Sequence, residues 1–331
     1  MAVANTHIRG SAALGRLTGW PRVLWVTGTV LLVTMVVHIA ALVITGDPMS
    51  GPVSLRKPAT FAETGWLTAW SVAVILPTLH TRAWQRHVIG TTVILFSVGE
   101  TAIIGFQAWR GVPSHYNFTT ALDAALMRGG AGGTAGIFII GVIVLLVAAL
   151  RSGDTSPSLR LGVCAGIIVL LMGCVIGFVM ISNNSGVYEG SVGAGFARQT
   201  AAYLGPDAAT VGPQYGLLRP ATRGGDLVAP HIIGIHGLVL LAVPAVLLAR
   251  TAMSPARQLK VIALAVTSVV VGMVLLLVHA LRQLPLDQLN PLALTALALC
   301  AIALLAAYAV VGSAVLKSVS LSLAEPRSRL E

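Results

Sequence analysis

Eight long apolar stretches, separated by shorter polar segments, dominate the pattern of this 331-residue chain. Each stretch is about as long as a helix needs to cross the roughly 30 Å hydrocarbon core of a membrane. We therefore predict an all-α integral membrane protein, a bundle of about eight transmembrane helices. The bundle covers 23–316, and its predicted spans are 23–45, 60–79, 88–108, 131–150, 161–182, 229–249, 261–281 and 292–316.

The composition supports a membrane protein. Hydrophobic residues make up 56% of the chain and charged residues only 10%, whereas soluble globular proteins carry about 25% charged residues. The 21 Lys and Arg residues are scattered between the apolar spans, as is usual for the flanks of membrane helices, which excludes nucleic acid as a partner and leaves the lipid bilayer. The three cysteines lie within apolar spans without CxxC spacing, so we expect neither a disulfide framework nor an iron–sulfur cluster.

Basic residues predict the orientation in the membrane. Thirteen lie on the side of the N-terminal segment 1–22 and the tail 317–331, and eight lie on the other side. The positive-inside rule then places both termini in the cytoplasm and the protein in the inner (cytoplasmic) membrane. The outer side carries a loop of about 46 residues, 183–228, which contains enough apolar and aromatic residues for us to predict an ordered cap over the helix ends.

Ionisable side chains gather toward the predicted outer face. A buried charge in lipid is costly enough to make each of them a functional candidate. They are five histidines and three carboxylates: His38, His115, His231, His236, His279, Glu63, Glu100 and Asp226. Counting about 1.5 Å per helical residue puts His38 and His236 each roughly 10 Å deep and Glu100 roughly 12 Å deep. We therefore expect His38 and His236 to lie close together.

Imidazole and carboxylate together, without thiolate, suit a transition metal such as iron, copper, manganese or zinc. Two deep histidines on different helices also suit haem. We predict the five histidines as metal ligands, Glu100 and Glu63 as catalytic proton acceptors or further ligands, and Asp226 as an acceptor that orients a histidine. Each residue also has a plainer interpretation, as an interhelical hydrogen bond or an interfacial side chain.

The leading functional hypothesis is a membrane-embedded oxidoreductase with a metal (iron or copper foremost) or haem near the outer face. Its substrate would be a small lipophilic or nitrogen-containing natural-product intermediate, and an electron-donor protein would be a partner. One alternative is a proton-coupled transporter or exporter, with Glu63, Glu100 and His38 as the proton path. Another is a b-type cytochrome-like electron-transfer subunit. No internal repeat is evident, which weakens an inverted-repeat transporter.

Three segments resemble motifs of a broad bacterial family of multi-pass membrane proteins without assigned biochemistry. They are 56–61 (RKPATF), 107–117 (QAWRGVPSHYN) and 224–236 (GGDLVAPHIIGIH). The chain departs from the family at 227–229 (LVA), where the family carries a basic residue before the histidine. A weaker resemblance is to the membrane protein of the valanimycin pathway, which is linked to azoxy bond assembly in actinobacteria. That resemblance implies N-oxidation or azoxy formation, in antibiotic biosynthesis.

Overall fold

The computed structural model describes residues 18–49, 53–115, 117–183, 203–205 and 224–324. Seven helices in this part are long and apolar enough to cross a membrane, and a bent pair of shorter helices brings the number to eight if the pair is one span. The chain is an all-α, multi-pass membrane bundle, which confirms the predicted fold class. Most of the predicted N-terminal segment and the end of the predicted C-terminal tail lie outside the described residues.

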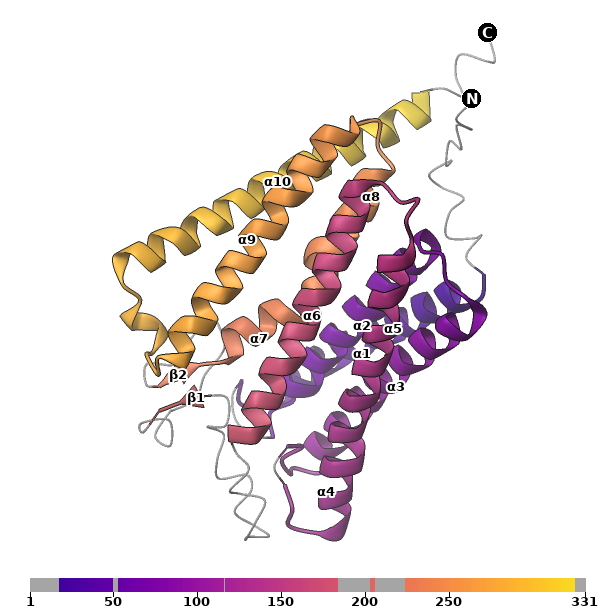
Figure 1. Ribbon diagram of the computed structural model, residues 1–331. Coiled ribbons are helices and arrows are strands. Elements are labelled where there is room, and N and C mark those ends of the chain that lie inside the picture. The colour runs from indigo at the N-terminus through magenta and orange to yellow at the C-terminus, as the bar shows by residue number, and fades with distance from the viewer. Residues whose placement is uncertain (1–17, 50–52, 116, 184–202, 206–223, 325–331) are drawn as a thin grey trace.

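Ten helices follow one another along the described part of the chain, and the longest connection between them, after α6, is described only in part (Figure 1). They are α1 (Trp20–Thr45), α2 (Arg56–Ile75), α3 (Ala83–Trp109), α4 (Ala121–Ala125), α5 (Gly133–Arg151), α6 (Pro157–Asn183), α7 (Val228–Ile235), α8 (Val243–Ala249), α9 (Pro255–Leu281) and α10 (Pro291–Ala324). Short 3-10 turns lie at Leu76–Thr78 and Leu286–Gln288, and π-helical turns lie at Leu126–Gly132 and Leu238–Ala242. Two short strands, β1 (Tyr203–Leu204) and β2 (Gly225–Asp226), pair antiparallel with Tyr203 opposite Asp226.

Local sequence accounts for several helix ends. α1 ends where Gly46 adopts a left-handed conformation with φ 66°, which a glycine takes without strain. α4 begins after Thr120, whose hydroxyl accepts the backbone N–H of Asp123 at 3.1 Å and so replaces a missing intrahelical partner. Pro255 and Pro291 open α9 and α10, where the missing proline N–H leaves no helical hydrogen bond unmade.

The bundle has two outer groups and a middle one. α1, α2 and α3 lie together on one side, α9 and α10 lie on the other, and α6 to α8 lie between them (Figure 1). Trp70 of α2 stacks on Trp25 of α1 with ring centroids 4.5 Å apart, and its indole N–H donates to the Trp25 carbonyl at 3.0 Å. The faces of α1 and α10 that point away from the bundle expose Val43 and Leu292, as expected for contact with lipid.

The sixth predicted span is a broken helix. α7 and the following segment Leu238–Ala249 are bent by 51° at a break that contains His236 and Gly237. The π-helical turn after the break leaves backbone groups that must find partners inside a membrane. Tyr308 of α10 supplies one, because its hydroxyl donates to the Leu240 carbonyl at 2.8 Å.

The predicted ordered cap, 183–228, is described only at 183, 203–205 and 224–228. There β1 and β2 pair, and Gly225 lies against the backbone of Ala280 near the end of α9. A side chain at Gly225 would clash with that backbone, so the glycine allows this close approach. The rest of the predicted cap lies outside the described residues.

Candidate functional site

Glu100 is a buried carboxylate within the membrane-crossing part of α3, with 4% of the residue exposed. Its Oε1 accepts a hydrogen bond from the Thr134 hydroxyl of α5 at 2.7 Å, whereas Oε2 makes no hydrogen bond with any described residue. Two other buried side-chain atoms also make no hydrogen bond with any described residue, Ser97 Oγ of α3 and Trp66 Nε1 of α2. Unpaired buried polar atoms are rare in native proteins and indicate water, an ion or a functional role.

Lys57, in the first turn of α2, places a positive charge within electrostatic range of Glu100. The residue is half-buried and also acts on His115, in the loop after α3. The two opposite charges do not form a contact ion pair, because within the described part of the chain the salt bridge is that of Arg110 with Asp123. Lys57 and Glu100 therefore form a long-range pair in which the Glu100 oxygen remains unpartnered.

His115 lies beside this pair. Its ring contacts Phe61 of α2 with centroids 5.7 Å apart, and its Nδ1 is 3.1 Å from the Ser114 hydroxyl. Burial, followed by the nearby positive charge of Lys57, lowers the pKa of His115 well below its ordinary value of 6.5. The imidazole is therefore neutral at pH 7 and can both donate and accept a hydrogen bond.

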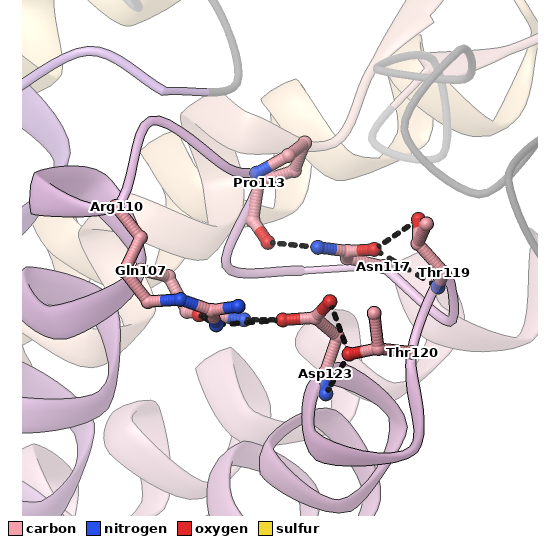
Figure 2. Close-up of polar contacts among 7 residues, drawn as sticks. All are labelled: Gln107, Arg110, Pro113, Asn117, Thr119, Thr120 and Asp123. Carbon is pink, nitrogen blue, oxygen red and sulfur yellow. Dashed lines mark hydrogen bonds and ion pairs between the residues drawn. The ribbon is translucent and has the colours of Figure 1, made fainter.

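A hydrogen-bonded network holds the loop that carries His115 (Figure 2). Asp123, at the start of α4, accepts from Gln107 Nε2 at 2.9 Å, from the Arg110 guanidinium at 2.8 Å and from the Thr120 hydroxyl at 2.7 Å. The guanidinium of Arg110 also donates to Gln107 Oε1. The network ties the end of α3 to α4, so much of the 107–117 motif has a structural role in positioning the loop.

A second part of the network closes the loop itself. The Asn117 amide donates to the Pro113 carbonyl at 3.1 Å, and its Oδ1 accepts from the Thr119 hydroxyl at 2.7 Å (Figure 2). A planar amide that bridges two loop positions fixes the backbone on either side of it. His115 lies between Pro113 and Asn117, so its position against α2 is set by these bonds.

The three motif segments meet along one face of α2. Its residues recur every three or four positions and so share a face of the helix: Lys57, Phe61, Thr64, Thr68 and Ser71. His115, from the segment 107–117, contacts Phe61 at one end of this face. His236, from the segment 224–236, lies beside Thr68 and Ser71 at the other end, with no space between them that would hold a water molecule. We refer to this face of α2 and the side chains against it as the α2 face.

His38 is buried outside the α2 face. Its Nδ1 donates to the Thr34 carbonyl at 2.9 Å, and its Nε2 accepts the indole N–H of Trp109 at 3.3 Å. Both ring nitrogens are therefore used by hydrogen bonds within the bundle. This arrangement matches the plainer of the two interpretations of His38, a structural link between α1 and α3.

His38 and His236 lie at different levels of the bundle. His38 and Pro58 both lie close to Gly105, whereas His236 lies beside Thr68 and Ser71. Pro58 and Thr68 are about ten residues apart on α2, which corresponds to about 15 Å along the helix axis. The structure does not place the two histidines in one layer. The depth estimate assumed a continuous sixth helix, and the bend at His236 changes the direction of that helix.

Two further predicted ligands are bonded to backbone carbonyls. His231 donates from Nδ1 to the Gly173 carbonyl of α6 at 2.8 Å. His279 is buried near the end of α9, and its Nε2 donates to the Pro285 carbonyl at 2.8 Å. The bond of His279 holds the turn between α9 and α10. That of His231 holds α7 against α6.

Two of the predicted carboxylates remain, Asp226 and Glu63. Asp226 is buried, and its Oδ1 accepts the Val228 N–H at 2.7 Å, so it caps the start of α7. Burial, together with the charge of Asp226, raises the pKa of Tyr203 above its ordinary value. Glu63 is half-buried on α2.

The predicted metal ligands do not converge. Among the described residues, no group of three or more His, Cys, Asp or Glu side chains could hold a metal ion. The structure brings together Lys57, Glu100 and His115, with Thr134 beside Glu100. Lys57 was not predicted as a site residue, although it lies in the 56–61 motif. A lysine at the start of a membrane helix more often contacts lipid headgroups, so the sequence alone did not single out Lys57.

Comparison with known proteins finds no relative on which to base a function. No family model matches the chain, and no curated protein and no solved structure matches it significantly. The α2 face and Glu100 are therefore the features of the molecule that point to a function.

Proposed function

We propose that the chain is a proton-coupled transporter of small lipophilic molecules, in which Glu100 carries the proton. The observation that supports this proposal is the state of its carboxyl group: buried within the bundle, hydrogen-bonded through one oxygen, and without a partner at the other among the described residues. Intramembrane carboxylates of this kind serve proton relays in pumps and transporters. A proton on Oε2 would remove the charge of Glu100, and loss of that proton would restore its attraction to Lys57.

The broken span supports the same proposal. Transporters commonly bind substrate where a discontinuous helix leaves the middle of the membrane lined by irregular backbone. Here the break lies at His236 and Gly237, beside Thr68 and Ser71 of α2. The α2 face thus extends from Lys57 and His115 to the break, and we assign it as the substrate path. As part of this proposal, the protein lies in the inner membrane with both termini in the cytoplasm, as predicted from the basic residues.

Transport can be tested with the full chain in liposomes that contain the pH dye pyranine. Ethidium and tetraphenylphosphonium are suitable probes, because their permanent charge keeps their passage through bare lipid independent of pH. We expect an imposed pH gradient to drive probe movement, with a counterflow of protons that empty liposomes lack. The proposal would be contradicted if the rate of probe movement did not depend on the pH gradient, or if probe movement produced no counterflow of protons.

The second candidate is the predicted membrane oxidoreductase, acting on a nitrogen-containing intermediate with an electron-donor protein. One observation favours it: His231 and His236 each donate Nδ1–H to a carbonyl, of Gly173 and Ile232, both at 2.8 Å. This is the tautomer of a metal-ligating histidine, which leaves Nε2 as the ligand atom. A metal does not fit the described residues on present geometry, however, because no third ligand joins the two histidines.

Elemental analysis and a visible spectrum of the purified chain distinguish the two candidates. The oxidoreductase requires stoichiometric iron or copper, or haem bands. In that case His231→Ala and His236→Ala should each lower the metal content severely, and His80→Ala, on an exposed loop, should not. Metal content at background level together with pH-driven probe exchange would leave the transporter as the function.

A further inference from the structure

A cavity of about 180 Å³ lies at the end of the bundle where α3 begins and α5 ends, opposite the end that carries α4 and the strands (Figure 1). It is lined by His80, Arg82, Trp84, Gln85, Ala148 and Arg151. Its volume compares with about 30 Å³ for a water molecule in the liquid. The cavity is therefore large enough for a phosphate group with several waters.

The lining is positively charged, and among the described residues it has no acidic partner. Arg82 and Arg151 come from different segments of the chain, and neither forms a salt bridge with a described residue. His80 adds an imidazole, which can donate a hydrogen bond. Guanidinium groups match the geometry of phosphate oxygens and bind them through paired hydrogen bonds.

Gln85 supplies a further donor from within the wall. The residue is 5% exposed, and its Oε1 accepts the backbone N–H of Arg82 at 2.8 Å. That bond fixes the side-chain amide so that Nε2 is the remaining polar group, and Nε2 makes no hydrogen bond with the described residues. An amide donor on a mostly buried residue, at a cavity lined by two arginines, indicates an anion with several acceptor oxygens.

Trp84 indicates that the anion belongs to a lipid. It lines the same cavity and is 54% exposed, and exposed tryptophans at the ends of membrane helices lie at the level of lipid headgroups. We propose that this cavity binds the phosphate of an anionic membrane lipid, with Arg82, Arg151 and Gln85 as its ligands. Basic pockets between membrane helices are known to bind headgroups in this way.

The test is native mass spectrometry of the full chain, titrated with phosphatidylglycerol or phosphatidylcholine of identical acyl chains. We expect tighter retention of phosphatidylglycerol, and a loss of apparent affinity of about fivefold for Arg82→Gln or Arg151→Gln and about 25-fold for the double variant. Arg257→Gln, an exposed arginine in the first turns of α9, is the matched control and should change nothing.

Three outcomes would overturn the proposal. The first is equal retention of the two lipids. The second is an equal loss of affinity for Arg257→Gln and for the double variant. The third is that salt displaces bound lipid neither from the wild type nor from any variant. Added inorganic phosphate that occupies the site without lipid retention would overturn the assignment to a lipid. A melting temperature for each variant shows that it folds. The salt dependence of phosphatidylglycerol retention, present in the wild type and lost in the double variant, supplies a second measurement.

Discussion

Glu100→Gln should reduce pH-driven probe exchange to below about one hundredth of the wild-type rate. Glutamine has the shape of glutamate and can still accept the Thr134 hydroxyl, but its amide cannot bind and release a proton near neutral pH. A positioned proton-transferring group contributes about 10² to 10⁴ in rate. A structural hydrogen bond between membrane helices contributes only about 1 kcal/mol, so the fold should persist. The measurement is pyranine fluorescence in proteoliposomes.

Two further variants make the result specific. Asp154→Asn carries the same chemical change on an exposed turn between α5 and α6 and should keep the wild-type rate. Glu100→Asp keeps the proton-binding group and should restore part of the exchange. If Glu100→Gln retains near wild-type exchange while it unfolds at the wild-type temperature, Glu100 is a structural residue and the proton path lies elsewhere.

The fold class could be predicted because transfer into lipid depends on the summed apolarity of a segment, which the sequence displays directly. The break at His236 and Gly237 could not be predicted, because both halves of the sixth span are apolar and have the composition of a helix. The contacts on either side of the break are tertiary: Gly234 closely approaches Gly173, and Tyr308 bonds the Leu240 carbonyl. Neither partner is close in sequence.

The candidate site was predictable in part. Glu100 and His115 were recognised because ionisable groups near apolar helices are costly. Lys57 was not recognised, because a cation is common at the start of a membrane helix. The use of both His38 nitrogens depends on Trp109 of α3, a contact that only the packing of α1 on α3 creates. Assigning chemistry from residue types alone therefore overestimated how many histidines are free to bind a ligand.

Gly234→Leu tests the contact that forms the broken span. The Cβ of residue 234 would lie 2.7 Å from the backbone nitrogen of Gly173, and a Cβ on Gly173 would lie 2.6 Å from the carbonyl carbon of Gly234. Because these neighbours are backbone atoms, they cannot rotate away as a side chain could. Overpacking of this kind typically costs about 1–3 kcal/mol and occasionally more. We expect about 3 kcal/mol here, since leucine adds three carbons beyond Cβ.

The measurement is thermal unfolding of the purified chain in detergent, followed by tryptophan fluorescence. Gly312→Leu is the matched control, because Gly312 lies on the exposed side of α10 with no neighbouring atom within 4 Å of a built Cβ. That variant should unfold at or slightly above the wild-type temperature, since leucine favours helix over glycine by somewhat under 1 kcal/mol. Equal melting temperatures for the two variants would show that α7 does not lie against α6 this closely. His231 could then not hold its bond to the Gly173 carbonyl, and the placement of His236 on the α2 face would lose its support.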